Sequence, residues 1–192
     1  MTAAQRLHTV LAEPGIEIMP GCFDAISGKL VADAGFKVTF MSGFAVSAAR
    51  LGLPDTGLIS FAEMLDTLRN CCSAAPDVPV IGDGDTGYGN AINVQRTVIE
   101  YARAGAAAVM IEDQVSPKKC GHTRGKQVII RDEARMKIRA AVDVKRDLDI
   151  LIWREPTPTP YTGLTKRLRD VVISRRKART SSFWRLPRMK RK

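Results

Sequence analysis

Two aspartates separated by one glycine are the most chemically suggestive feature of the sequence. Asp83 and Asp85 lie in the segment GDGDTG (82–87), directly after an apolar run. The segment matches the GxGxxG pattern of dinucleotide-binding loops, but the two carboxylates would repel a pyrophosphate group. Paired hard oxygen ligands instead suit Mg²⁺ (or Mn²⁺) with its water shell. Glu112, at the end of a later apolar run, and Asp55 could add acids to the same ion, whereas a solvated acidic turn is the alternative.

A second candidate lies in the polar segment EDQVSPKKCGHTRGK (112–126). This segment is longer than most connections of its kind, and long loops at such positions often act as lids. It contains Cys120, flanked by Lys118, Lys119, Gly121 and His122. Nearby cations lower the pKa of a thiol, which would make Cys120 a proton donor or a nucleophile near neutral pH. A solvated basic loop with an incidental thiol is the alternative.

Apolar runs alternate with helical patterns along the first 152 residues. We expect strands at 16–21, 37–43, 78–85, 107–114 and 148–152. We expect helices over 24–35, 60–72, 93–105 and 131–147, the second of them opened by a capping box of Ser60 and Glu63. Five strands with intervening helices indicate about five βα units and a parallel sheet.

The carboxyl ends of parallel strands carry the chemistry in α/β folds. The residues that follow the first four apolar runs are Cys22-Phe23-Asp24, Met41-Ser42-Gly43-Phe44, Asp83-Gly84-Asp85 and Glu112-Asp113-Gln114. Carboxylates therefore follow three of these four strands. We expect them to meet at one edge of the sheet.

The net charge of +10 is unevenly distributed. Residues 153–192 hold 13 Lys and Arg against two acids, so residues 1–152 hold 17 basic and 18 acidic residues and are close to neutral. No apolar run is long enough to span a membrane, and the N-terminal residues do not have the pattern of a signal peptide. The four cysteines form no CxxC pair. These features predict an unprocessed, cytoplasmic protein with reduced thiols and no membrane partner.

Several motifs together resemble a known superfamily. PGCFDA, FMSGFAVSAARLGLPDTG, VIGDGDTGYGN, IEDQ and PKKCGH occur in the order and spacing of the isocitrate lyase and phosphoenolpyruvate mutase superfamily. The segment KKCGHTRGKQVI resembles the branch of methylisocitrate lyases, oxaloacetate hydrolases and carboxyvinyl-carboxyphosphonate phosphorylmutase-like proteins. The resemblance runs from about residue 10 to residue 152. It implies an α/β fold, here the N-terminal part of a (β/α)8 TIM-type barrel.

The resemblance also assigns site residues. It places Asp83 and Asp85 at the metal, with Asp55 and Glu112 in the outer shell. It places the substrate carboxylate at Ser42, Gly43 and Phe44, although the family often has glycine where this chain has Phe44. It implies that Cys120 is the general acid of a mobile lid, together with Lys119, Gly121 and His122. Arg154 falls where the family has a substrate-binding arginine, but its neighbours Glu155 and Pro156 differ from the family pattern.

The implied activity is that of a Mg²⁺-dependent carbon–carbon lyase. Such an enzyme cleaves a 2-hydroxy di- or tricarboxylate of the methylisocitrate or alkylmalate type to an enolate, which then receives a proton. Oxaloacetate hydrolase and phosphonomutase are alternatives within the superfamily. The partner would be a small carboxylic acid, and the homo-oligomer typical of the family would be lost by truncation.

Residues 153–192 break the pattern of the preceding chain. They contain a PTPTP run and a basic charge run of the kind found in disordered tails. Residues 152–157 (IWREPT) can be encoded by the codons ATC TGG CGA GAA CCG ACG. If the same bases are read in triplets that begin two bases later, they encode L-A-R-T-D, which is the sequence that the family pattern has at this place. We therefore expect a partial barrel domain at 1–152 followed by a reading-frame change. A genuine basic extension that binds polyanions and an inactive truncated fragment are the alternatives; scattered aromatic residues argue against nucleic acid.

Overall fold

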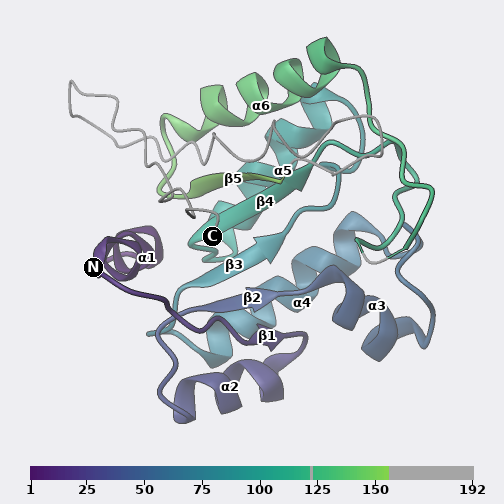
Figure 1. The fold of residues 1–192 in the computed structure, drawn as a ribbon. Coiled ribbons are helices and arrows are strands. Elements are labelled where there is room, and N and C mark those ends of the chain that lie inside the picture. The colour runs from purple at the N-terminus through teal and green to yellow at the C-terminus, as the bar shows by residue number, and fades with distance from the viewer. Residues whose placement is uncertain (122, 156–192) are drawn as a thin grey trace, which may run out of the picture.

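A computed structural model describes residues 1–121 and 123–155 of the chain. Five parallel strands form one sheet in which each strand pairs with the next along the sequence (Figure 1). The strands are β1 (Gly21–Cys22), β2 (Thr39–Met41), β3 (Val80–Asp83), β4 (Ala108–Glu112) and β5 (Leu151–Glu155). This is the predicted parallel sheet. The predictions for His122 and for residues 156–192 lie outside the described residues.

The described helices are α1 (Ala3–Ala12), α2 (Ala25–Asp33), α3 (Gly43–Leu51), α4 (Phe61–Ala74), α5 (Ala91–Arg103) and α6 (Arg131–Lys145). The predicted capping box is present at α4, where the Ser60 hydroxyl accepts from the Glu63 amide and the Glu63 carboxylate accepts from the Ser60 amide. Helix α3 was not predicted. Ser42 caps its N-terminus, and Gly52 ends it with a left-handed φ of 64° that a glycine adopts without steric cost.

The two faces of the sheet carry different cores because successive side chains of a strand point in opposite directions. On one face, Val109, Ile111 and Ile152 pack with residues of the helices such as Leu68 and Val98. Full burial of a side chain of this size stabilises the fold by about 1.5–3 kcal/mol. On the other face, residues such as Val38, Ile81 and Leu151 pack with Ala4 and Leu7 of α1.

The segment before β1 differs from the expectation. Residues 16–20 were predicted to form most of the first strand, but Ile16 and Ile18 are 97% and 67% exposed and the strand begins at Gly21. Pro20 has no amide hydrogen, so only its carbonyl joins the ladder, where it accepts from the Phe40 amide. No helix in the described part of the chain is long and apolar enough to cross a membrane.

Candidate active site

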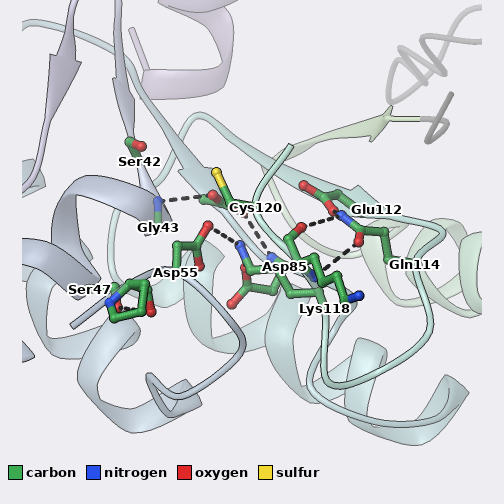
Figure 2. A network of polar contacts seen from close by, with 12 residues as sticks. Ser42, Gly43, Ser47, Asp55, Asp85, Glu112, Gln114, Lys118 and Cys120 are labelled. Atoms are coloured by element: carbon green, nitrogen blue, oxygen red, sulfur yellow. Dashed lines mark hydrogen bonds and ion pairs between the residues drawn. The ribbon is translucent and has the colours of Figure 1, made fainter. Parts of the chain in front are cut away.

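Acidic side chains meet at the carboxyl edge of the sheet, as predicted. Asp83 ends β3, Asp85 follows it in the next turn, and Asp55 comes from the loop after α3; all three are at most 5% exposed. The Glu112 amide, at the end of β4, donates to the Asp85 carbonyl at 2.8 Å. The tertiary structure therefore brings together the four acids proposed from the sequence, three of which are labelled in Figure 2.

Lys118 lies between two of these acids. Its Nζ atom is 2.6 Å from Oδ1 of Asp85 and 2.8 Å from Oδ2 of Asp55, and the lysine is 5% exposed. Burial acts to lower the pKa of Lys118, but the carboxylates of Asp85 and Asp83 outweigh it, so the pKa is raised. The side chain is held as a cation. The sequence pointed to Lys118 only as a neighbour of Cys120 and did not place it among the acids.

The cluster contains more acids than the single cation of Lys118 can neutralise, and the pKa values of these acids are raised. Burial, and next the negative charge of Asp83, raise the pKa of Asp85 to about 7 and that of Glu112 to about 7. Burial and the charge of Asp83 also raise the pKa of Glu155 at the end of β5. Glu155 pairs in register with Glu112 of the neighbouring β4, which places it beside the acidic cluster. The sequence analysis missed it because the last strand was expected to end at residue 152. The cluster favours added positive charge.

The turn after β3 holds Asp85 in an uncommon conformation. Its φ of +47° lies in the left-handed region, which costs a non-glycine residue on the order of 1–3 kcal/mol. The Asp83 carboxylate stabilises this geometry by accepting from the Asp85 amide at 3.0 Å, while its other oxygen accepts from the Gly43 amide at 2.9 Å. A Cβ atom on Gly43 would lie 2.8 Å from that second oxygen. Glycine at position 43 therefore allows α3 to approach Asp83.

The three residues assigned to the substrate carboxylate lie at the N-terminus of α3. The Ser42 hydroxyl accepts from the Ala45 amide, and the Gly43 amide is engaged by Asp83. Phe44 is 54% exposed. The first amides of a helix attract anions, and in α3 the Asp83 carboxylate and the Ser42 hydroxyl already accept from two of them. Among the described residues, the Phe44 amide is the one of the first three that has no such partner.

The loop after β4 carries the predicted general acid. The side chain of Gln114 donates to the Lys119 carbonyl at 2.9 Å and accepts from the Lys119 amide at 3.1 Å. These bonds hold the backbone beside Cys120, which is 8% exposed (Figure 2). The Lys119 side chain is exposed, whereas that of Lys118 is buried. The structure thus places Lys118 inside the cluster, while Lys119 and Gly121, which the resemblance assigned to the loop around Cys120, are exposed.

Arg154 is not brought to the acids. It lies on the same face of β5 as Ile152, which packs under the helices, whereas Trp153 and Glu155 point to the other face. Arg154 lines a cleft of about 540 Å³ together with residues of α6 such as Arg139. In this structure, the assigned substrate-binding arginine faces α6 instead of the carboxyl edge of the sheet.

The residues fit a hydrated divalent cation better than a closed protein cage. Within residues 1–121 and 123–155, no three His, Cys, Asp or Glu side chains lie close enough to enclose a metal ion. Mg²⁺, however, keeps several waters and binds through one or two carboxylates. The buried Oδ1 atom of Asp55 has no hydrogen-bond partner among the described residues, so it is available to such a water shell.

Comparison with known proteins shows which family the chain resembles. The family model described as phosphoenolpyruvate phosphomutase matches residues 7–153. The chain is 47% identical over 167 residues to a chloroplastic carboxyvinyl-carboxyphosphonate phosphorylmutase of Arabidopsis thaliana, covering 87% of this chain and 49% of that protein. It is 40% identical over 168 residues to a 2,3-dimethylmalate lyase of Eubacterium barkeri, covering 88% and 58%. The chain thus spans about half the length of these relatives.

Solved structures support the same grouping. Oxaloacetate acetylhydrolase bound to 3,3-difluorooxalacetate matches with a TM-score of 0.77 and 38% identity, over 81% of this chain and 54% of that one. Phosphonopyruvate hydrolase in complex with oxalate and Mg²⁺ matches with a TM-score of 0.72 and 31% identity, over 81% and 53%. The five-stranded sheet matches the N-terminal part of the barrel of these proteins, as the sequence resemblance implied. With its family match, acidic edge and cysteine loop, the chain belongs to the phosphoenolpyruvate phosphomutase family, within the phosphoenolpyruvate mutase/isocitrate lyase superfamily.

Proposed function

We propose that this chain carries the catalytic edge of a Mg²⁺-dependent carbon–carbon lyase acting on a 2-hydroxy di- or tricarboxylate. The observation that carries the proposal is the buried ion pair of Asp85 and Lys118 at the carboxyl edge of the sheet, with the buried Cys120 two residues after Lys118 in the same loop. The lyase activity named for the Eubacterium barkeri relative supports it.

Each group in the cluster has a chemical role in this proposal. A divalent cation held through Asp85, with Asp83, Asp55 and Glu112 in its outer shell, would stabilise the negative charge that develops on an enolate oxygen. In this proposal the N-terminus of α3 binds the substrate carboxylate at the Phe44 amide, since Asp83 and the Ser42 hydroxyl accept from the Gly43 and Ala45 amides.

Proton delivery falls to Cys120. Its S–H bond breaks and a C–H bond forms at the enolate carbon, which leaves a thiolate on the protein. The ammonium of Lys118, two residues earlier in the same loop, stabilises the negative charge of the cluster during this step. The backbone bonds between Gln114 and Lys119 keep the loop segment in place.

Hydrolysis of oxaloacetate and phosphonomutase chemistry are the alternatives, and relatives of both kinds support them. A panel assay with Mg²⁺ separates the three. The substrates are 2-methylisocitrate, 2,3-dimethylmalate, oxaloacetate and phosphonopyruvate, tested on the chain as written and on a version with the family's reading frame restored after residue 152. We expect turnover of a 2-hydroxy acid. Folded protein that turns over none of the four would refute the proposed function.

We further propose that 1–152 is a partial barrel domain and that a reading-frame change follows it. The family match ends at residue 153, next to the expected change, which supports this division. Sequencing of genomic and transcript DNA across codons 148–156 tests it. An extra or missing base relative to the family's frame is expected, and a continuous frame that also encodes the basic residues in close relatives would contradict the division.

A further inference from the structure

Four backbone carbonyls at the end of β3 and in the turn that follows it accept hydrogen bonds from different parts of the molecule. The donors are the Tyr101 hydroxyl to Asp83 at 2.9 Å, the Glu112 amide to Asp85 at 2.8 Å, Lys137 Nζ to Thr86 at 3.2 Å and the Thr97 hydroxyl to Gly87 at 3.3 Å. These donors come from α5, β4 and α6. The turn that carries Asp85 is therefore stabilised by hydrogen bonds from neighbouring helices and a neighbouring strand as well as by bonds among its own residues.

Lys137 is the donor that requires the most explanation. It lies in α6 and is only 5% exposed. Burial lowers the pKa of its ammonium, and Glu133, whose carboxylate oxygen is 3.9 Å away, opposes that effect. An apolar side chain of similar length would fill the same space without burying a charge. The feature that lysine adds here is its bond to the Thr86 carbonyl.

The hydrogen bond from Lys137 to the Thr86 carbonyl lies next to Asp85, the residue with the strained backbone conformation. Thr86 directly follows Asp85, whose left-handed φ persists only if surrounding contacts hold it. The Glu112 amide holds the carbonyl of Asp85, and Lys137 holds the next carbonyl along the chain. Together they restrict rotation on the C-terminal side of Asp85, which sets where its carboxylate points.

We propose that Lys137 is a positioning residue of the cation site, acting through the Thr86 carbonyl to hold the Asp85 carboxylate in its binding orientation. The inference rests on the proposed function, since it assumes that Asp85 contacts a divalent cation. It goes beyond that function because it assigns a role to a buried lysine outside the acidic cluster.

The test compares Lys137→Met with Lys145→Met in the full chain. Lys145 is also buried in α6, with its pKa lowered by burial, and it lies eight residues further along, about 12 Å along the helix axis. Its replacement therefore measures the effect of removing a buried ammonium from the same helix. Mn²⁺ binding is followed by electron paramagnetic resonance, and amide hydrogen exchange is measured at Gly87 and Glu112, whose amides bond within and across the turn.

We expect Lys137→Met to weaken Mn²⁺ binding about 10-fold or more, as for other residues that orient a metal ligand, with Lys145→Met unchanged. Exchange at Gly87 and Glu112 should accelerate in the first variant alone. Lys137→Gln keeps a donor on a shorter side chain and should give an intermediate loss; it replaces the Met variant if that does not melt cooperatively. Equal Mn²⁺ affinity in the Lys137 variants and the parent would overturn the inference.

The two proposals can fail separately. A parent protein that binds no Mn²⁺ would refute the cation site of the proposed function. In that case the exchange rates still decide the positioning role, because unchanged exchange at Gly87 and Glu112 in Lys137→Met would show that Lys137 does not hold the turn.

Discussion

Lys118 and Asp85 form a buried ion pair in which the Nζ and Oδ1 atoms are 2.6 Å apart and neither side chain is more than 6% exposed. The pair joins the loop after β4 to the turn after β3, and Asp55 extends it to the loop after α3. A cation from the protein itself thus lies among the acids proposed to bind Mg²⁺. Removal of either partner leaves an uncompensated charge in a buried place.

Replacement of Lys118 by Met should therefore destabilise the protein in the absence of divalent cations. Loss of one partner of a buried ion pair typically costs about 3–5 kcal/mol. Because the cluster would then lack its own cation, a bound Mg²⁺ would replace the lost positive charge and should raise the melting temperature more in the variant than in the parent. Thermal melts with and without Mg²⁺ measure both effects. Lys119→Met, at an exposed side chain, is the control and should change stability by only about 0.5 kcal/mol. Similar melting of Lys118→Met and Lys119→Met would show that the ion pair has no net effect on stability.

Asp85→Ala should lose Mn²⁺ affinity and activity together, because Asp85 is the proposed direct ligand. Asp83→Asn should have a milder effect, since one amide oxygen can still accept a backbone hydrogen bond. Calorimetric titration with Mn²⁺ and the panel assay provide the two measurements. Parent-like Mn²⁺ binding by Asp85→Ala would instead identify the segment as a structural turn.

Cys120→Ser should lower kcat by orders of magnitude while binding of oxalate, a mimic of an enolate product, hardly changes. Serine is similar in size to cysteine, but its hydroxyl is a far weaker acid than a thiol, so proton delivery should fail. Single-turnover kinetics and oxalate titration separate the two effects. A rate within about twofold of the parent, or ~0.4 kcal/mol of transition-state stabilisation, would exclude Cys120 as the acid. The hydrolase or mutase alternative would then be preferred.

Gly43→Ala should disturb Asp83, because the new Cβ atom would lie 2.8 Å from a carboxylate oxygen. Crowding of this kind costs about 1–3 kcal/mol and should also weaken Mn²⁺ binding by moving Asp83. Gly21→Ala is the control, since its Cβ atom would meet only the Phe40 carbonyl oxygen at an ordinary 3.8 Å. Chemical denaturation and Mn²⁺ titration measure the effects. Parent-like behaviour of Gly43→Ala would mean that α3 can shift without affecting the site.

Local patterns in the sequence determined much of the architecture. The alternation of apolar runs and helical periods predicted five parallel strands, and Ser60 with Glu63 predicted the start of α4, because helix caps depend on residues close together in the chain. The position of acids after successive strands predicted the acidic edge. The prediction for residues 16–20 was wrong. Their apolar pattern suggested a strand, but these residues form no strand at the edge of the sheet and their isoleucines are exposed.

Only the tertiary structure decided which neighbours along the chain point into the site. Lys118 is buried between two aspartates and Lys119 is exposed, although the two are adjacent and identical. Glu155 joins the acids and Arg154 faces α6, because alternate residues of a strand point to opposite faces and the register of β5 sets which face each one takes. The contact of Lys137 with Thr86 spans 51 residues of sequence. The spacing of a motif shows which types of residue occur along the chain. The direction in which each side chain points, and its contacts with distant parts of the chain, are set by the packing of the folded protein.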